Sequence, residues 1–296
     1  MTPLVSSGVA EGLGRLRPGG GGAGVLGTCA LVWVEGPDAI GFLQGLLSND
    51  VAAAPVGSGL RALLLSDKGK LQADVRAHRD ADDAYTLVVA PAGGGALAAA
   101  LERYHFSEDL ELVGPVDAET LTVGGLETLP AAGADLVLPG LAPGTWDLVG
   151  ADARAMLAAA GLPEAPAEAL EVLRVEAGAG RFGQDFTEAN LVQEAGLEDV
   201  AVSFEKGCYL GQETVARVRY RGHVNRRLRG LRLGAPADEG ATVALSGEEV
   251  GRVTSAALSP DLGPIALAMV RRAAEPDAEV VVEGSGPARV VALPFR

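Results

Sequence analysis

Short apolar runs in the first half of the chain predict several strands interrupted by two helices. The apolar run at residues 29–34 predicts a buried strand that ends before Gly36 and Pro37. Residues 38–47 place apolar side chains at helical spacing behind Asp38, a residue type that caps helices well. Further strands are predicted at 60–65, 71–78, 84–90, 110–113 and 120–123, and a second helix at 96–104. This order of elements indicates an α+β fold and not regular βαβ units.

The pattern changes further along the chain. Residues 151–160 and 167–177 predict two helices, whereas residues 226–296 form short alternating runs bounded by Gly, Pro, Asp or Ser. Strands at this spacing predict a small β-barrel or sandwich. The glycine-rich stretch that ends at Gly24 predicts a flexible N-terminal segment. We therefore predict three parts, which are a flexible segment at 1–24, an α+β region at 25–221 and a barrel domain at 222–296.

Composition excludes several classes of protein. The chain has 296 residues, 48% hydrophobic and 21% charged, which is enough for two or three domains with buried cores. Its formal charge of −15 argues against nonspecific binding of nucleic acid. No apolar run approaches the ~18 residues of a membrane-spanning helix, and no export signal is evident. The two cysteines are interpreted as free thiols of a cytoplasmic protein.

Positive charge gathers at and after one stretch, KGCYLGQE at residues 206–213. The arginines that follow, together with His223, are Arg217, Arg219, Arg221, Arg226, Arg227, Arg229 and Arg232. This cluster predicts an anion site for phosphate, a polycarboxylate tail or RNA, or else a solvated face whose arginines pair with acidic neighbours. RNA is the weaker option, because only Tyr209 and Tyr220 are available for base stacking.

Two candidate site residues stand out. Cys208 lies between Gly207 and Gly211, just before a pattern that favours a helix over an alternating strand, and such a position stabilises a thiolate. We interpret it as a reactive or redox-sensitive thiol, with a small buried hydrophobe as the alternative. Glu176 is a candidate to accept paired hydrogen bonds from an aminopyrimidine ring, or a surface acid paired with a nearby arginine. No metal-ligating motif, P-loop, GxGxxG or GxSxG is present.

The octapeptide at 206–213 closely resembles the K-G-C-[FY]-x-G-Q-E hallmark of the YgfZ family. Members of that family are folate-binding proteins linked to iron–sulfur cluster assembly and tRNA modification, and they are related to the glycine-cleavage aminomethyltransferase, the T-protein. Three further blocks resemble the family: residues 36–51, RVEAG at 174–178 and QEAGL at 193–197. The resemblance covers roughly residues 30–232.

This resemblance implies an aminomethyltransferase-like folate-binding fold, with three domains in a ring around a cavity that holds tetrahydrofolate. It implies two interleaved subdomains within 25–221, contact of Glu176 with the pterin, and Cys208 as a hallmark thiol near the cavity. The T-protein's catalytic aspartate has no evident counterpart near Tyr85 and Pro91. Lys206 and the arginines are expected to hold the glutamate tail of folate. The full predicted folate-binding set is Asn49, Glu176, Lys206, Tyr209, Gln212 and Arg217.

The resulting hypothesis is a folate-binding accessory protein that supports assembly or repair of iron–sulfur enzymes, and thereby tRNA modification, with Cys208 as its reactive thiol. Its expected partners are folate, iron–sulfur enzymes or assembly proteins, and tRNA. One alternative is a tetrahydrofolate-dependent aminomethyl transferase or demethylase. The other is a tRNA-binding partner of a modification enzyme.

Overall fold

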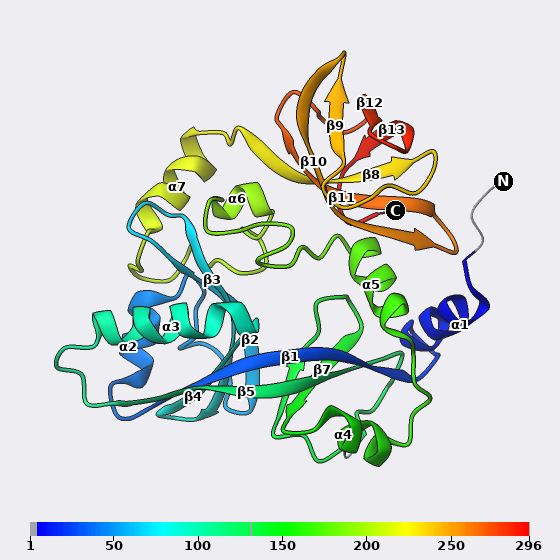
Figure 1. The fold of residues 1–296 in the computed structure, drawn as a ribbon. Coiled ribbons are helices and arrows are strands. Elements are labelled where there is room, and N and C mark those ends of the chain that lie inside the picture. The colour runs from blue at the N-terminus through cyan, green and yellow to red at the C-terminus, as the bar shows by residue number, and fades with distance from the viewer. Residues whose placement is uncertain (1–4, 131, 296) are drawn as a thin grey trace.

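Two long strands connect the first two lobes of the molecule. The computed structural model describes residues 5–130 and 132–295. In it β1 (Gly22–Glu35) and β5 (Glu111–Gly124), each of 14 residues, pair antiparallel from end to end. They lie inside a seven-stranded sheet of order β2-β3-β4-β1-β5-β7-β6 (Figure 1). Both lobes are therefore built on one continuous sheet.

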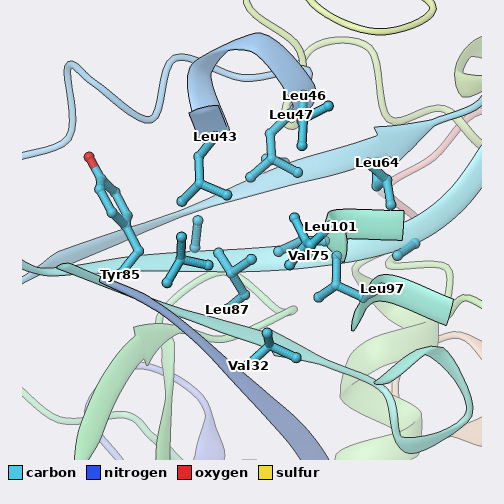
Figure 2. Packing of buried hydrophobic residues seen from close by; sticks show 14 of the residues in the cluster. Val32, Leu43, Leu46, Leu47, Leu64, Val75, Tyr85, Leu87, Leu97 and Leu101 are labelled. Atoms are coloured by element: carbon cyan, nitrogen blue, oxygen red, sulfur yellow. The ribbon is translucent and has the colours of Figure 1, made fainter. Parts of the chain in front are cut away.

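The first lobe packs two helices against half of this sheet. The strands β2 (Ser58–Leu65), β3 (Leu71–Ala81) and β4 (Ala84–Val89) follow each other antiparallel. The helices α2 (Ala39–Leu46) and α3 (Pro91–Tyr104) pack leucine side chains against the apolar face of these strands (Figure 2). Burial of each such side chain contributes about 1.5–3 kcal/mol. The fully buried members include Leu43, Leu47, Leu64, Leu87, Leu97 and Leu101.

The second lobe occupies the other half of the sheet. It consists of β6 (Leu136–Pro139), β7 (Thr145–Gly150) and α4 (Ala153–Ala160), with Leu121, Val123 and Met156 in its core. The helix α5 (Ala167–Glu176) then leads toward the third lobe through a loop. Two further helices, α6 (Val192–Ala195) and α7 (Gln212–Arg221), follow that loop. The predicted helix at the end of the octapeptide is thus confirmed.

The third lobe is a closed six-stranded barrel of order β10-β11-β8-β13-β12-β9. Closure removes the exposed strand edges that invite pairing with other chains. Its core contains Leu231, Val243, Val253, Val280 and Val290. The strands are β8 (Arg226–Leu233), β9 (Thr242–Leu245), β10 (Glu248–Ser259), β11 (Gly263–Arg271), β12 (Glu279–Val282) and β13 (Gly286–Val291). The predicted α+β fold with a C-terminal barrel is confirmed.

The structure corrects two local predictions. The strands predicted at 110–113 and 120–123 are one strand, β5, because Gly114 and Pro115 are taken up at an irregularity in its pairing with β1. The segment predicted as flexible contains helix α1 (Ser7–Leu16), whose Leu13 and Leu16 are buried against α5. Residues 1–4 of that segment lie outside the described residues.

Candidate functional site

A central cavity of about 300 Å³ lies where the two lobes meet the loop that follows α5. Strands β1, β2, β3, β4, β5 and β7 supply most of its wall. The rest comes from Ala90, Pro91, Leu141 and residues 180–182. Its apolar side chains include Leu26, Val88, Val89, Leu141 and Phe182, and its charged ones are Arg61, Asp74, Arg76, Asp147 and Arg181. Ligand pockets commonly combine an apolar wall with a few fixed polar groups in this way.

Asp74 and Arg61 form a two-pronged ion pair on this wall. Arg61 Nε donates to Asp74 Oδ1 at 2.8 Å, and Nη2 donates to Oδ2 at 2.5 Å. Both side chains are largely buried, at 13% and 17% exposure. Burial acts to lower the pKa of Arg61, but the charge of Asp74 and its hydrogen bonds together outweigh burial and raise that pKa. The fork therefore fixes the carboxylate in one orientation.

A second ion pair lies beside the first. Arg76 Nη1 donates to Asp147 Oδ2, and the other carboxylate oxygen accepts a hydrogen bond from Thr122 Oγ1 at 2.6 Å. The side chain of Asp147 is only 1% exposed, so both of its oxygens need these donors. Cys29 lines the same wall, and burial raises the pKa of its thiol. The two ion pairs thus make this wall of the cavity polar and rigid.

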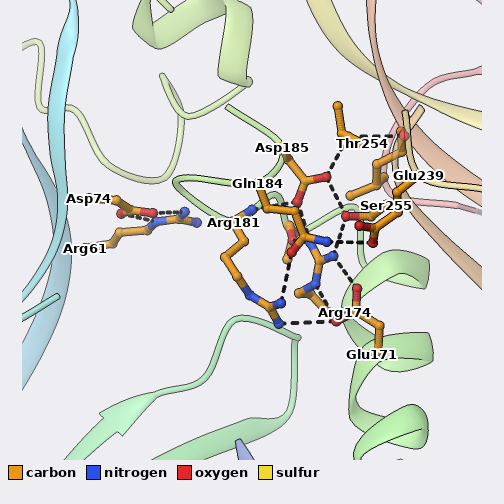
Figure 3. Close-up of polar contacts among 12 residues, drawn as sticks. Arg61, Asp74, Glu171, Arg174, Arg181, Gln184, Asp185, Glu239, Thr254 and Ser255 are labelled. Atoms are coloured by element: carbon orange, nitrogen blue, oxygen red, sulfur yellow. Dashed lines mark hydrogen bonds and ion pairs between the residues drawn. The ribbon is translucent and has the colours of Figure 1, made fainter. Parts of the chain in front are cut away.

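Arg181 lies on the opposite side of the cavity. Its Nη1 donates to Gln184 Oε1 at 3.0 Å, and its Nη2 donates to Glu171 Oε2 at 3.2 Å. In Figure 3 it lies on the side of its polar network that faces the Arg61–Asp74 pair. Among the five charged side chains that line the cavity, Arg181 is the most exposed, at 38%.

A buried network behind Arg181 joins three parts of the chain (Figure 3). Arg174 from α5 donates to Asp185 Oδ2 in the loop at 2.7 Å and to Ser255 Oγ in β10 at 2.7 Å. Asp185 also accepts hydrogen bonds from the hydroxyl groups of Thr254 and Ser255, each at 2.6 Å. Because this aspartate is fully buried, its charge depends on these donors. The network fixes the barrel against the cavity loop.

The octapeptide is anchored to the end of α2. Lys206 Nζ donates to the backbone oxygens of Gln44, Leu47 and Asn49 at 2.7, 2.7 and 2.9 Å. The carbonyls of Gln44 and Leu47 lie at the helix C-terminus, where backbone acceptors lack intrahelical donors, and Asn49 follows the helix. Burial lowers the pKa of Lys206 from 10.5 to about 8, although Asp50 acts to raise it. All three amine hydrogens are therefore engaged within the protein.

The other octapeptide residues divide into buried and exposed ones. Tyr209 is buried, which raises the pKa of its phenol to about 12, and its ring lies 5.3 Å from Lys206 Nζ. Cys208 is exposed. Gln212 begins α7, on which Arg217 is exposed. Asn49 is partly buried and donates through Nδ2 to the Arg61 backbone oxygen at 2.8 Å.

Glu176 has partners from two distant segments. Its Oε2 accepts a hydrogen bond from Arg17 Nη2 at 2.7 Å, and its Oε1 accepts one from Ser259 Oγ at 2.6 Å. Arg17 follows α1 and also pairs with Asp261. The Glu176 side chain is 12% exposed. Both carboxylate oxygens are thus already engaged by the segment after α1 and by the barrel.

The structure brings together a different set of residues from the predicted one. Within the described ranges, none of the seven predicted side chains is among those that line the central cavity. The cavity's charged groups were missed, although a signal was present. Arg61, Asp74 and Arg76 share one face of the predicted hairpin, where Arg61 pairs with Arg76 across the strands. Three charged residues on one face of a hairpin whose other face is apolar indicate that the charged face meets polar groups.

Comparison with known proteins agrees with this architecture. Residues 226–296 match the family described as the glycine cleavage T-protein C-terminal barrel domain. An aminomethyltransferase of Rubrobacter xylanophilus is 30% identical over 304 residues, which cover 88% of this chain and 79% of that protein. The chain belongs to the aminomethyltransferase family. A family member from Moorella thermoacetica is also 30% identical, with 89% and 83% covered.

Two further comparisons concern the fold and a shorter stretch of the chain. The crystal structure of the glycine cleavage system aminomethyltransferase T from Bartonella henselae superposes with a TM-score of 0.81 at 23% identity, covering 100% of this chain and 91% of that one. It shows the same fold. A chloroplastic protein of Arabidopsis thaliana is 34% identical over 140 residues, and this match spans 30% of its length. No helix among the described residues is long and apolar enough to cross a membrane.

Proposed function

We propose that the protein binds a reduced folate in the central cavity and acts as a folate-dependent one-carbon transferase of the aminomethyl class. The names of its relatives support this reaction class. The observation that carries the proposal is the Asp74 carboxylate, fixed by Arg61 on a cavity wall opposite Arg181. We place this activity in the cytoplasm. We prefer this transferase function to the accessory role that the sequence suggested.

The cavity fits the ring end of a folate. A pterin is flat, carries amino and ring N–H donors, and needs a carboxylate or carbonyl acceptor together with apolar walls. Asp74 supplies the acceptor through the lone pairs that its hydrogen bonds with Arg61 leave free, while Val88, Val89 and Phe182 supply apolar surface. About 300 Å³ is at the small end of the ~300–1,000 Å³ range of ligand pockets. The glutamate tail would therefore extend out of the cavity, past Arg181.

The residues of this chain would contribute binding, orientation and charge. A bound tetrahydrofolate would supply the nitrogen atoms that accept a one-carbon unit. Asp74 would orient the reactants and stabilise positive charge that develops on an aminomethyl nitrogen. Arg61 would hold that carboxylate in place, so that no reorganisation is needed during the reaction. The apolar wall would exclude water from the reactive centre.

Asp74→Asn is expected to weaken tetrahydrofolate binding by about 10- to 100-fold, because a hydrogen bond to a charged group is worth about 1.5–3 kcal/mol. Equilibrium dialysis of tetrahydrofolate against wild type and variant measures this. Asp82→Asn is the matched control, since Asp82 is 94% exposed and pairs with Arg79 at the surface. Ammonia release from an aminomethyl donor, dependent on tetrahydrofolate, tests the reaction itself.

Glu176→Gln distinguishes two possible pterin sites, which are the central cavity and the position at Glu176 that the family resemblance implies. The contacts with Arg17 and Ser259 lead us to expect lower stability and nearly unchanged folate affinity for this variant. Equal affinity of Asp74→Asn and Asp82→Asn would place folate elsewhere. If Glu176→Gln alone weakened binding while remaining folded, the pterin would lie at Glu176 and the cavity assignment would be wrong.

A second candidate is the accessory role of the YgfZ-type octapeptide, with iron–sulfur enzymes, their assembly proteins or tRNA as partners. The observation that favours it is the exposed Cys208, presented between the buried Lys206 and Tyr209. We expect Cys208→Ser to retain folate affinity but to lose support of iron–sulfur enzyme activity in cells that depend on this protein. Full support by this serine variant would contradict a thiol-based role.

A further inference from the structure

A second cavity, of about 340 Å³, lies between the end of α7 and the barrel. Its wall is formed by the end of α7 and the segment that follows it, by strand β8, and by the end of β11 with residues 272–275. Gln193 and Glu198 complete it. Val218, Val224, Val270 and Ala274 give it an apolar part. It shares no lining residue with the central cavity among the residues that the structure describes.

Positive charge is concentrated in this second cavity. Six arginines and two glutamates line it, whereas the whole chain carries a formal charge of −15. Arg226 lies directly opposite Arg271 in the β8–β11 pairing, and like charges in that position are destabilising. The six are Arg219, Arg226, Arg227, Arg229, Arg271 and Arg272. Such an arrangement weakens the barrel unless an anion binds between the arginines.

Most of these arginines lack an acidic partner. Within the described part of the chain, only Arg219 and Arg227 among the six form ion pairs, with Asp199 at 3.2 Å and Glu198 at 3.5 Å. Arg229 is only partly exposed, and burial together with the charge of Arg227 lowers its pKa, although the more weakly acting charges of Glu275 and Glu198 oppose this. A guanidinium in this position favours an added anion, because the anion compensates both effects.

Glu198 adds an independent observation. Its Oε2 is buried and has no hydrogen-bond partner, which is rare for a buried polar atom. Burial also raises the pKa of this carboxyl group. The atom belongs to a side chain that lines the cavity among the arginines. A ligand that combines negative groups with a hydroxyl or amino donor would satisfy both the arginines and Glu198.

We propose that this second cavity binds a nucleoside diphosphate or triphosphate. The phosphate groups would contact the guanidinium groups of Arg226, Arg229 and Arg272, whose planar forks match phosphate oxygens. A ribose hydroxyl or base amino group would donate to Glu198, and the valines would contact the nucleoside. The volume of about 340 Å³ falls within the size range of small-ligand pockets.

Calorimetric titration of the full chain with orthophosphate, pyrophosphate, AMP and ADP tests this proposal. We expect pyrophosphate to bind more tightly than orthophosphate, and ADP more tightly than AMP and pyrophosphate. Arg229→Gln is expected to weaken ADP binding by at least about tenfold. Arg289→Gln is the matched control, because Arg289 pairs with Asp277 on the exposed surface of the same barrel.

Two variants complete the test. Glu198→Gln is expected to strengthen pyrophosphate binding, since it removes a negative charge, but to reduce the advantage of ADP over pyrophosphate. If Arg229→Gln is not folded, the exposed Arg272 provides the same test as Arg272→Gln. Equal ADP affinity of the cavity variants and Arg289→Gln would overturn the proposal. Tighter binding of poly-glutamate or single-stranded RNA than of ADP, lost in Arg229→Gln, would also overturn it.

Discussion

Replacing Arg174 by methionine is expected to lower the free energy of unfolding by about 3–5 kcal/mol. Arg174 is 4% exposed and forms an ion pair with Asp185, whose side chain is fully buried. Without the guanidinium, the aspartate keeps hydrogen bonds from Ser255 and Thr254 but has no cation beside it. An uncompensated buried charge is among the most destabilising changes in a protein core.

Urea unfolding followed by circular dichroism measures this effect. Arg154→Met is the control, because Arg154 pairs with Glu164 at the surface with 67% and 48% exposure, and such pairs contribute about 0–1 kcal/mol. The double variant Arg174→Met/Asp185→Asn is expected to lose less stability than its two single variants lose together, because it no longer buries a lone charge. Equal losses in Arg174→Met and Arg154→Met would show that the network is not essential.

Lys206→Met is expected to cost about 2–3 kcal/mol, because it removes a charged donor from three backbone oxygens, of which that of Asn49 keeps a hydrogen bond from Val51 N. The other two lysines provide a graded control. Lys70 donates to one backbone oxygen, that of Ala189 at 2.8 Å, and Lys68 is exposed in the same turn. We expect losses in the order Lys206, Lys70, Lys68. An equal effect of all three substitutions would contradict an anchoring role for Lys206.

The same lysine makes the stability of the protein depend on pH in the alkaline range. Burial lowers the pKa of Lys206 to about 8, against 10.5 for an unperturbed lysine. Between these values the unfolded chain binds more protons, so stability rises with pH by at most ~1.4 kcal/mol per unit. The difference in unfolding free energy between wild type and Lys206→Met should therefore grow from pH 8 to pH 9.5. A constant difference would rule out a lowered pKa.

Local patterns in the sequence predicted strands well where buried and exposed residues alternate regularly. In β3, Val75 and Ala77 point to the core, and the run of alternating residues was sufficient to predict the hairpin. Helix α1 was missed because its residues are weakly patterned and precede the glycine-rich stretch that ends at Gly24, and because α1 itself contains three glycines. The structure explains one of them, since a Cβ on Gly12 would lie 2.5 Å from Pro166 Cδ. Close packing on α5 therefore requires a glycine that lowers helix propensity.

The site was harder to predict than the fold, because its contacts are distant in sequence. The octapeptide stood out by its charge, but the partners of Lys206 lie about 160 positions earlier, at the end of α2. Glu176 was a candidate from its local motif, whereas its partner Arg17 follows a helix that was not predicted. Asp147 resembles an ordinary strand residue until β3 places Arg76 beside it. No local pattern contains such pairings.

The pairing of β1 with β5 also determines when the sheet can be completed during synthesis on the ribosome. Gly22 pairs with Gly124, so the first half of β1 has no partner in this sheet until roughly a hundred more residues have been made. Only Ala30–Glu35 can pair earlier, with β4. Long-range pairing of this kind slows folding, because a large loop must close before the contact forms. Nascent chains that end before β5 would thus expose an unpaired strand, a natural binding site for chaperones.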